Sequence, residues 1–213
     1  MQQSIASALK DSKVAISETD TCLGFSTSVF SRDGLANLYD LKGMDRNKPT
    51  SILVDSLDMA EEFAVVDEFS AMIMAEILPG PYTILLPRTA NLPDFFNPGV
   101  EDVGVRMIAG FPIVEVVREL GHPVTTTSAN RHGQPTVSSY RELIEQYQDV
   151  ENREQLLANL VNLLPEEPFT KNGASTILRM TNGRIQLLRI DIGHQELVEK
   201  FARYIDGFYN QAD

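Results

Sequence analysis

The chain has little cysteine, little positive charge and no long hydrophobic run. One cysteine among 213 residues excludes an internal disulfide bond and is typical of a reducing compartment. Eighteen Lys and Arg against thirty Asp and Glu give a formal net charge of −12, which disfavours a broad nucleic-acid surface. No apolar segment approaches the roughly 20 residues that span a bilayer. We therefore expect a cytoplasmic protein that does not associate with membranes.

The common fingerprints of nucleotide and metal sites are missing as well. Neither GxxxxGK[ST] nor GxGxxG occurs in the sequence. His122, His132 and His194 lie far apart without metal-ligand spacing, so no metal site is predicted. Cys22 has no neighbouring His or Asn to activate it, which favours a small buried residue over a nucleophile.

The hydrophobic pattern predicts alternating helices and strands. Helices are expected at residues 2–11, 33–42, 58–77, 111–121, 139–147 and in the C-terminal tail, and strands at 13–17, 51–54, 82–87, 103–107 and 123–128. Residues 151–164 fit a helix passing into a strand. STILRM and RIQLLRI predict a hairpin around Thr181-Asn182-Gly183, because Asn-Gly favours the turn that matches strand twist. Without strict βαβ regularity, the pattern predicts an α/β domain with a mixed sheet.

Two polar stretches stand out at the ends of these elements. KGMDRNKP (42–49) gathers Lys42, Arg46 and Lys48 in an otherwise acidic chain. Such a cluster is either a solvated helix end, favourable to the helix dipole, or the wall of a local anion pocket. TTTSAN (125–130) carries five hydroxyl or amide side chains in six residues. These side chains offer hydrogen-bond donors without bulk, which suits an anion or nucleotide cradle.

Seven motifs in order carry a resemblance to a known family: ETDTCLGF, KGMDRNKP, PGPYT, VGVRMI, TSANRHG, GASTI and LLRIDIG. Over about residues 5–193 they resemble the YrdC-like family of threonylcarbamoyl-AMP synthases, in its short single-domain form. The resemblance implies a twisted mixed sheet with flanking helices around a concave cavity. It also implies a YrdC-like domain over residues 1–193, with a C-terminal helix at 194–213 packed on the same domain.

The activity that the resemblance implies is nucleotidyl transfer. Family members combine L-threonine, bicarbonate and ATP into threonylcarbamoyl-AMP and pyrophosphate, for tRNA N6-threonylcarbamoyladenosine synthesis. Mg²⁺ is expected to be held mostly by ATP oxygens and water. Downstream tRNA-modification proteins are the expected partners, and tRNA itself is an indirect one.

The resemblance also implies roles for individual residues. Lys48 and Arg106 would be catalytic: Lys48 would bind the ATP phosphates, and the Arg106 guanidinium fork would clamp the threonine carboxylate. The other residues expected at ATP are Lys42, Ser128, Asn130, Thr136 and Arg189. Those expected at threonine are Thr19, Thr126 and Ser175, beside Arg106.

One departure from the family pattern leaves an alternative open. Met44 stands where the family normally has an arginine on ATP, and methionine cannot donate a hydrogen bond to phosphate. Losing one such contact could cost roughly 1.5–3 kcal/mol of binding. The alternative is a non-catalytic YciO-like paralogue that binds a nucleotide or double-stranded RNA.

Overall fold

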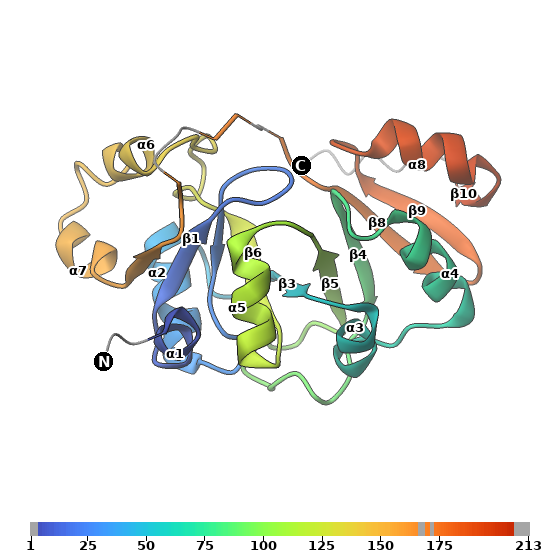
Figure 1. Cartoon of the computed structure of the whole chain (residues 1–213), viewed down its shortest axis with the longest axis horizontal. Coiled ribbons are helices and arrows are strands. Elements are labelled where there is room, and N and C mark those ends of the chain that lie inside the picture. Colours follow the sequence, from blue (N-terminus) through green and yellow to red (C-terminus); the bar gives the residue numbers. More distant parts are fainter. Residues whose placement is uncertain (1–3, 166–168, 171–172, 207–213) are drawn as a thin grey trace.

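In the part of the chain that the structure describes, ten strands form one twisted mixed sheet at the centre of the molecule (Figure 1). The computed structural model describes residues 4–165, 169–170 and 173–206. Across the sheet the strand order is β10-β9-β8-β4-β5-β3-β6-β2-β1-β7. The strands are β1 (Val14–Ser17), β2 (Gly24–Ser26), β3 (Ser51–Val54), β4 (Tyr82–Pro87), β5 (Asp102–Met107), β6 (Val124–Ser128), β7 (Leu160–Asn162), β8 (Thr176–Thr181), β9 (Arg184–Arg189) and β10 (Ile205–Asp206).

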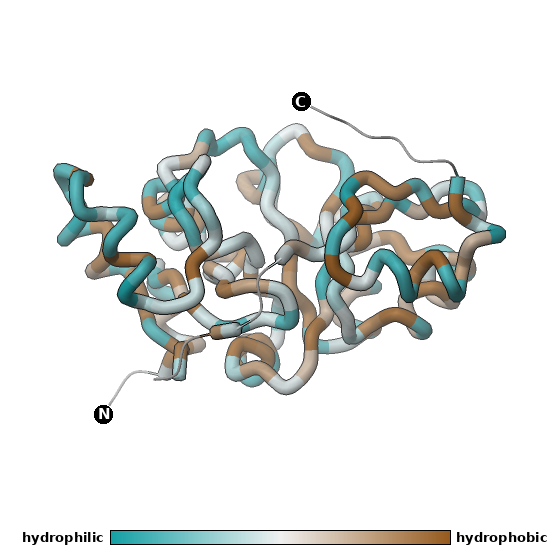
Figure 2. The backbone as a smooth tube through the Cα atoms, turned by 90° about the horizontal axis from the view of Figure 1, so that it is seen from above, coloured by the Kyte–Doolittle hydropathy of each residue, from teal (hydrophilic) through white to brown (hydrophobic). Residues whose placement is uncertain are grey.

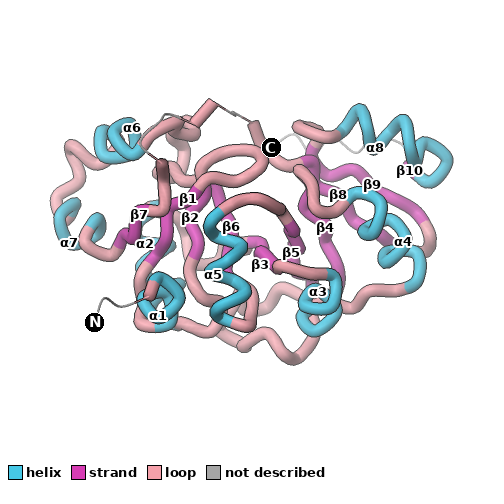
Figure 3. The backbone as a smooth tube through the Cα atoms, in the orientation of Figure 1, coloured by secondary structure: helices cyan, strands magenta, loops and turns pink. Residues whose placement is uncertain are grey.

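Helices flank this sheet on both faces. They are α1 (Ile5–Lys10), α2 (Arg32–Lys42), α3 (Leu57–Phe63), α4 (Glu68–Ile77), α5 (Pro112–Leu120), α6 (Tyr140–Glu145), α7 (Arg153–Leu157) and α8 (His194–Phe201). In Figures 1 and 3, α1, α5 and α3 lie in front of the strands and α2 lies behind β1. The predicted α/β fold with a mixed sheet and flanking helices is thus confirmed.

The side-chain alternation of the strands divides the core between the two faces. On β1, Ala15 packs in the cluster formed by α1 and α5, whereas Val14 and Ile16 pack with α2. A third cluster joins α3, α4 and α8 to β4, β5, β8 and β9. Figure 2 shows that the left-hand end of the molecule, where α7 lies, is largely hydrophilic. The strands at the centre of the sheet are packed by these core clusters on their faces, so side chains at the ends of these strands are held in fixed positions.

Helix α2 ends at Lys42 as predicted and begins one residue before the predicted start at Asp33. The Ser31 hydroxyl accepts the Gly34 N–H at its start, and Gly43 ends it in the left-handed conformation with φ of 57°. Glycine adopts that conformation at little cost. Because the helix stops at this point, the chain turns and carries the basic segment toward β3.

The β8–β9 hairpin is also confirmed. Asn182 and Gly183 have φ values of 53° and 70°, the positive values that an Asn-Gly hairpin turn requires. The hairpin brings Arg189, at the end of β9, back beside the start of β8.

Two helix predictions need correction. Residues 58–77 form α3 and α4 rather than one helix, because Ala64 bridges to Arg88 and the Val65 N–H donates to the Pro87 carbonyl. The C-terminal helix ends at Phe201; a 3₁₀ turn (Ala202–Tyr204) and β10 follow, and residues 207–213 lie outside the described part. Leu197 and Phe201 nevertheless pack in the same core cluster as β8 and β9. The division of the chain at residue 193 stays a prediction.

Within the described residues, no helix combines the length and hydrophobicity needed to cross a bilayer.

Candidate functional site

A polar cavity of about 290 Å³ lies where the ends of several central strands meet. Short hydroxyl side chains and two arginines dominate its walls. Of the residues predicted for the site, it brings together Arg106, Thr126, Ser128, Thr136, Ser175 and Arg189. Thr21, Cys22, Thr50, Ser51, Thr83 and Thr127 also line it. Such a surface offers many hydrogen-bond donors and two positive charges in a small volume.

Strand β5 provides the floor because of its alternation. Val103 and Val105 point into the hydrophobic core, so Gly104 and Arg106 face the other way. A Cβ at Gly104 would lie 2.5 Å from Ser51 Oγ and 3.0 Å from Thr83 Cγ2. Glycine is therefore required at this position for β3, β4 and β5 to approach one another below the cavity.

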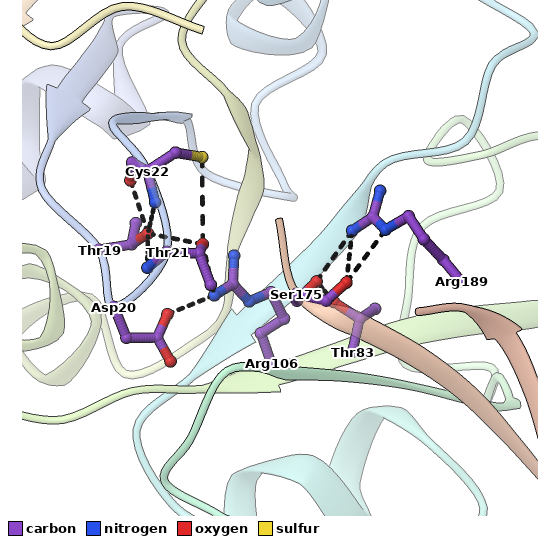
Figure 4. Close-up of polar contacts among 8 residues, drawn as sticks. All are labelled: Thr19, Asp20, Thr21, Cys22, Thr83, Arg106, Ser175 and Arg189. Carbon is purple, nitrogen blue, oxygen red and sulfur yellow. Dashed lines mark hydrogen bonds and ion pairs between the residues drawn. The ribbon is translucent and has the colours of Figure 1, made fainter. Parts of the chain in front are cut away.

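Arg106 is buried and held by the loop between β1 and β2 (Figure 4). Its Nη2 forms an ion pair with the Asp20 carboxylate and donates to Thr21 Oγ1 at 3.2 Å. Removing a charge from water is tolerated when such partners compensate it. Among the described residues, Nη1 and Nε of Arg106 make no hydrogen bond. The guanidinium is thus fixed in place, and its Nη1 is left to donate to a ligand.

Arg189 is fixed in the same way from the other side of Ser175. Its Nε and Nη2 donate to the Ser175 carbonyl at 3.0 and 2.8 Å, and Nη2 also contacts Ser175 Oγ at 3.0 Å. Ser175 Oγ in turn shares a 2.7 Å hydrogen bond with Thr83 Oγ1. Burial lowers the pKa of Arg189, although an arginine keeps its charge in proteins. Thr83 was not predicted individually, but the PGPYT motif contains it.

Thr19 shapes the β1–β2 loop instead of lining the cavity. Its hydroxyl donates to the Cys22 carbonyl at 2.6 Å and accepts the Thr21 and Cys22 N–H groups. This turn presents Thr21 and Cys22 to the cavity and Asp20 to Arg106. Burial raises the pKa of the Cys22 thiol, which agrees with the expectation of a buried cysteine without nucleophilic activation.

The basic cluster of residues 42–48 does not act as one surface. Lys42 is only 3% exposed, and its amine donates to the Ser128 carbonyl (2.5 Å), the Asn130 carbonyl (3.1 Å) and Asn130 Oδ1 (3.2 Å). These contacts use all three donors of the ammonium group. Burial lowers the pKa of Lys42 to about 8. Lys42 therefore pins the 128–130 loop to α2 and does not line the cavity.

Asn130 is occupied by the same loop. Its Nδ2 donates to the Arg131 and Gln134 carbonyls, and its Oδ1 accepts the Ser128 hydroxyl at 2.6 Å. Like Lys42, Asn130 does not line the cavity, and the predicted contacts of both residues with ATP stay predictions.

Arg46 and Lys48 point in different directions. Arg46 pairs with Asp40 on the exposed side of α2, so it does not take the place of a cation at Met44. Lys48 is exposed next to Pro49, which lines the cavity, and its amine lies 2.9 Å from Nε2 of His132. In the described part of the chain, no group of three or more His, Cys, Asp or Glu could hold a metal ion.

Fold and cavity together define an α/β protein with a small, cationic, hydroxyl-lined pocket. The family model of Sua5, YciO and YrdC, described as "Telomere recombination", matches residues 7–190. The chain belongs to this family.

Two curated relatives bear the name threonylcarbamoyl-AMP synthase. A Methanocaldococcus jannaschii protein, provisionally named a threonylcarbamoyl-AMP synthase, is 33% identical over 132 residues, which are 62% of this chain and 61% of the relative. A Chromobacterium violaceum threonylcarbamoyl-AMP synthase is 26% identical over 188 residues, covering 87% of this chain and 91% of the relative. The chain thus spans about three fifths of the archaeal relative and most of the bacterial one.

Solved structures show the same fold. Sua5 of Pyrococcus abyssi in complex with L-threonine matches with a TM-score of 0.78 at 22% identity, covering 94% of this chain and 57% of that one. YciO of Escherichia coli matches with a TM-score of 0.72 at 17% identity, covering 88% and 87%. The fold is therefore common to both branches considered from the sequence.

Proposed function

We propose that this protein is an L-threonylcarbamoyl-AMP synthase, which uses L-threonine, bicarbonate and ATP. One observation carries the proposal: Arg106 and Arg189 both line one small cavity, and each has an Nη1 group without a hydrogen-bond partner among the described residues. Two such groups suit a reaction that joins two anions, a carboxylate-bearing amino acid and a polyphosphate.

Arg106 is the residue that we assign to the threonine carboxylate. Its Nη2 is already fixed by Asp20 and Thr21 and its Nε is buried, so Nη1 is the donor that is preorganised for a second carboxylate. The neighbouring hydroxyls of Thr126 and Ser175 lie in the same cavity and suit the polar groups of threonine. Arg189, Ser128 and Thr136 then remain for the nucleotide, with Lys48 at the edge.

The chemistry needs positioning more than a nucleophile. The threonine amine nitrogen bonds to the carbon of carbon dioxide and loses a proton, or bonds to the carbon of bicarbonate with loss of a water molecule, and either route gives a carbamate. A carbamate oxygen then bonds to the α-phosphorus of ATP while the bond to the β-phosphate breaks, and pyrophosphate leaves with that electron pair. Fixed cations reduce the repulsion between the two anions and orient them. Mg²⁺ would arrive with ATP, held by phosphate oxygens and water, which fits the lack of a carboxylate cluster among the described residues.

A second candidate is a non-catalytic member of the family that binds a nucleotide or double-stranded RNA. The ion pair between Arg46 and Asp40 favours it, because this pair leaves no arginine of the 42–48 segment turned toward the place of the missing cation. The product's recipients, the downstream tRNA-modification proteins, belong to the synthase proposal alone.

Pyrophosphate release separates the two candidates. Purified protein is incubated with ATP, Mg²⁺ and bicarbonate, with and without L-threonine, alongside a Met44→Arg variant. The synthase proposal expects release that depends on threonine and on bicarbonate in the natural protein. Pyrophosphate release by Met44→Arg but not by the natural protein would show that the activity was lost at this position. If neither protein releases pyrophosphate, the result would support the non-catalytic candidate.

A further inference from the structure

Two loops from distant parts of the sequence meet at the edge of the cavity and bring three basic side chains together. One loop follows α2 and carries Lys48; the other follows β6 and carries Arg131 and His132. The main-chain N–H of His132 donates to the Lys42 carbonyl at 2.7 Å, and the Tyr39 hydroxyl donates to the Lys48 carbonyl at 2.7 Å. Both loops are thus tied to the end of α2.

The contact between Lys48 and His132 is unusual for an acidic protein. The Lys48 ammonium has only donors, so at 2.9 Å the His132 Nε2 must accept, and the ring proton is then on Nδ1. No described carboxylate forms an ion pair with Lys48, Arg131 or His132, whereas Arg46 in the same segment pairs with Asp40. An exposed ammonium therefore rests on an imidazole with no anion between them.

Arg131 adds a third basic group from the His132 side. Its guanidinium lies over the Tyr147 ring, 5.3 Å from the centroid, and against Gly43, whose absent Cβ would be 2.7 Å from Nη2. Its Nη1 is buried and has no hydrogen-bond partner among the described residues. The remaining charged groups on the two loops and at the end of α2 are the enclosed Lys42, the Asp40–Arg46 pair and Asp45.

We propose that Lys48 and His132 form a polyphosphate-binding pair at the edge of the cavity, with Arg131 behind it, and that this pair supplies the positive charge that Met44 does not. This inference rests on the proposed function, and it identifies His132 as a further residue that binds the phosphate chain of the nucleotide. When a phosphate approaches, the ammonium exchanges the imidazole for a phosphate oxygen. The released imidazole can then carry its ring proton on Nε2 and donate it to the phosphate in a hydrogen bond.

The pair gives a direct prediction for the binding of inorganic tripolyphosphate, measured by calorimetry. His132 supplies one ring nitrogen to the phosphate chain, so removing the ring removes one hydrogen bond to a charged group. We expect His132→Ser to weaken tripolyphosphate binding about tenfold, the size of one charge-assisted hydrogen bond.

Two further variants make the test specific. His132→Arg carries a permanent charge and several donors, so its tripolyphosphate binding should stay as tight as that of the natural protein. His122→Ser, the same change at a ring that packs on Phe30 away from the cavity, should bind like the natural protein. L-threonine binding should be unchanged in all three variants.

The results separate this inference from the synthase proposal. A His132→Ser variant that binds tripolyphosphate like the natural protein, or loses no more affinity than His122→Ser, would overturn the polyphosphate pair. So would a natural protein that binds no tripolyphosphate. The expected loss of binding in His132→Ser without threonine-dependent pyrophosphate release would support the pair and contradict the synthase, and release without any His132 effect would do the reverse.

Discussion

The two sides of the candidate site are built differently. The sheet wall, formed by Thr83, Arg106, Ser175 and Arg189, consists of side chains that hydrogen-bond one another or the adjacent loop from strand ends. The loop rim, formed by residues 42–48 and 128–134, holds its basic groups in two connecting segments. The wall is fixed before any ligand arrives, whereas Lys48 and His132 on the rim are exposed.

This difference separates two uses of positive charge. Arg106 and Arg189 are anchored through some of their nitrogens and keep others for a ligand. Lys42 uses its whole ammonium group to hold a loop, while Lys48, six residues later, uses its amine on an imidazole. Sequence proximity therefore does not indicate a shared role within the basic cluster.

The largest effect is expected from the wall. Arg106→Ala should reduce threonine-dependent pyrophosphate release at least about 100-fold, because it removes the carboxylate-binding fork. Because it also takes away the ion-pair partner of Asp20, its free energy of unfolding should be measured in urea. Arg106→Lys is the matched control: it keeps a charge near Asp20 but lacks the planar fork, so we expect folded protein with little activity. Full activity in Arg106→Lys would contradict the assignment.

A pair of lysine variants sharpens the comparison within the rim. Lys42→Met should lower the free energy of unfolding by about 1–3 kcal/mol, since it leaves buried carbonyl groups without their donor. Lys48→Met should leave stability within about 0.5 kcal/mol and weaken ATP binding about tenfold. Urea denaturation and calorimetry measure the two properties. Equal losses of stability in both variants would show that Lys42 and Lys48 play the same structural role, which would contradict the comparison.

Gly104 tests the close approach of strands beneath the wall. Gly104→Ala should cost about 1–3 kcal/mol of stability, because the new methyl group would meet Ser51 Oγ at 2.5 Å. Adding Ser51→Ala removes that oxygen and should recover part of the loss. Thermal or urea unfolding of the single and double variants measures this, and an additive double variant would mean that Ser51 is not the obstacle.

The smallest effect is a pH dependence that originates at Lys42. Its pKa is about 8 in the folded protein and 10.5 for an ordinary lysine, so between these values the unfolded state binds more protons. The contribution of Lys42 to stability should therefore rise with pH across this window. This contribution is the difference in unfolding free energy between the natural protein and Lys42→Met, measured at pH 7.5 and at pH 10. A difference that is constant or falls with pH would contradict the low pKa.

Local signals in the sequence predicted most elements, and non-local contacts account for the failures. The Asn182-Gly183 turn and the Gly43 helix end depend on their own backbone conformations, and both were predictable. The break between α3 and α4 depends on pairing with residues 87–88, and β10 depends on β9. No local pattern of residues 58–77 or 194–206 reveals those partners.

The site shows the same division. The motifs that contain Arg106, Ser175 and Arg189 could be found because their order along the chain resembles a family pattern. The enclosure of Lys42 could not be predicted, because its acceptors lie 86 and 88 residues away. Thr83 and Ser51 were missed for the same reason: each looks like an ordinary strand residue until β4, β5 and β3 are placed side by side.

The central claim is that Arg106 in the wall binds the amino acid and that Lys48 and His132 on the rim bind the polyphosphate. The most direct measurement is calorimetric titration of Arg106→Lys and Lys48→Met with L-threonine and, separately, with tripolyphosphate. We predict that Arg106→Lys loses threonine binding and keeps tripolyphosphate binding, and that Lys48→Met does the opposite. Two variants that lose both ligands equally, or neither, would contradict the claim.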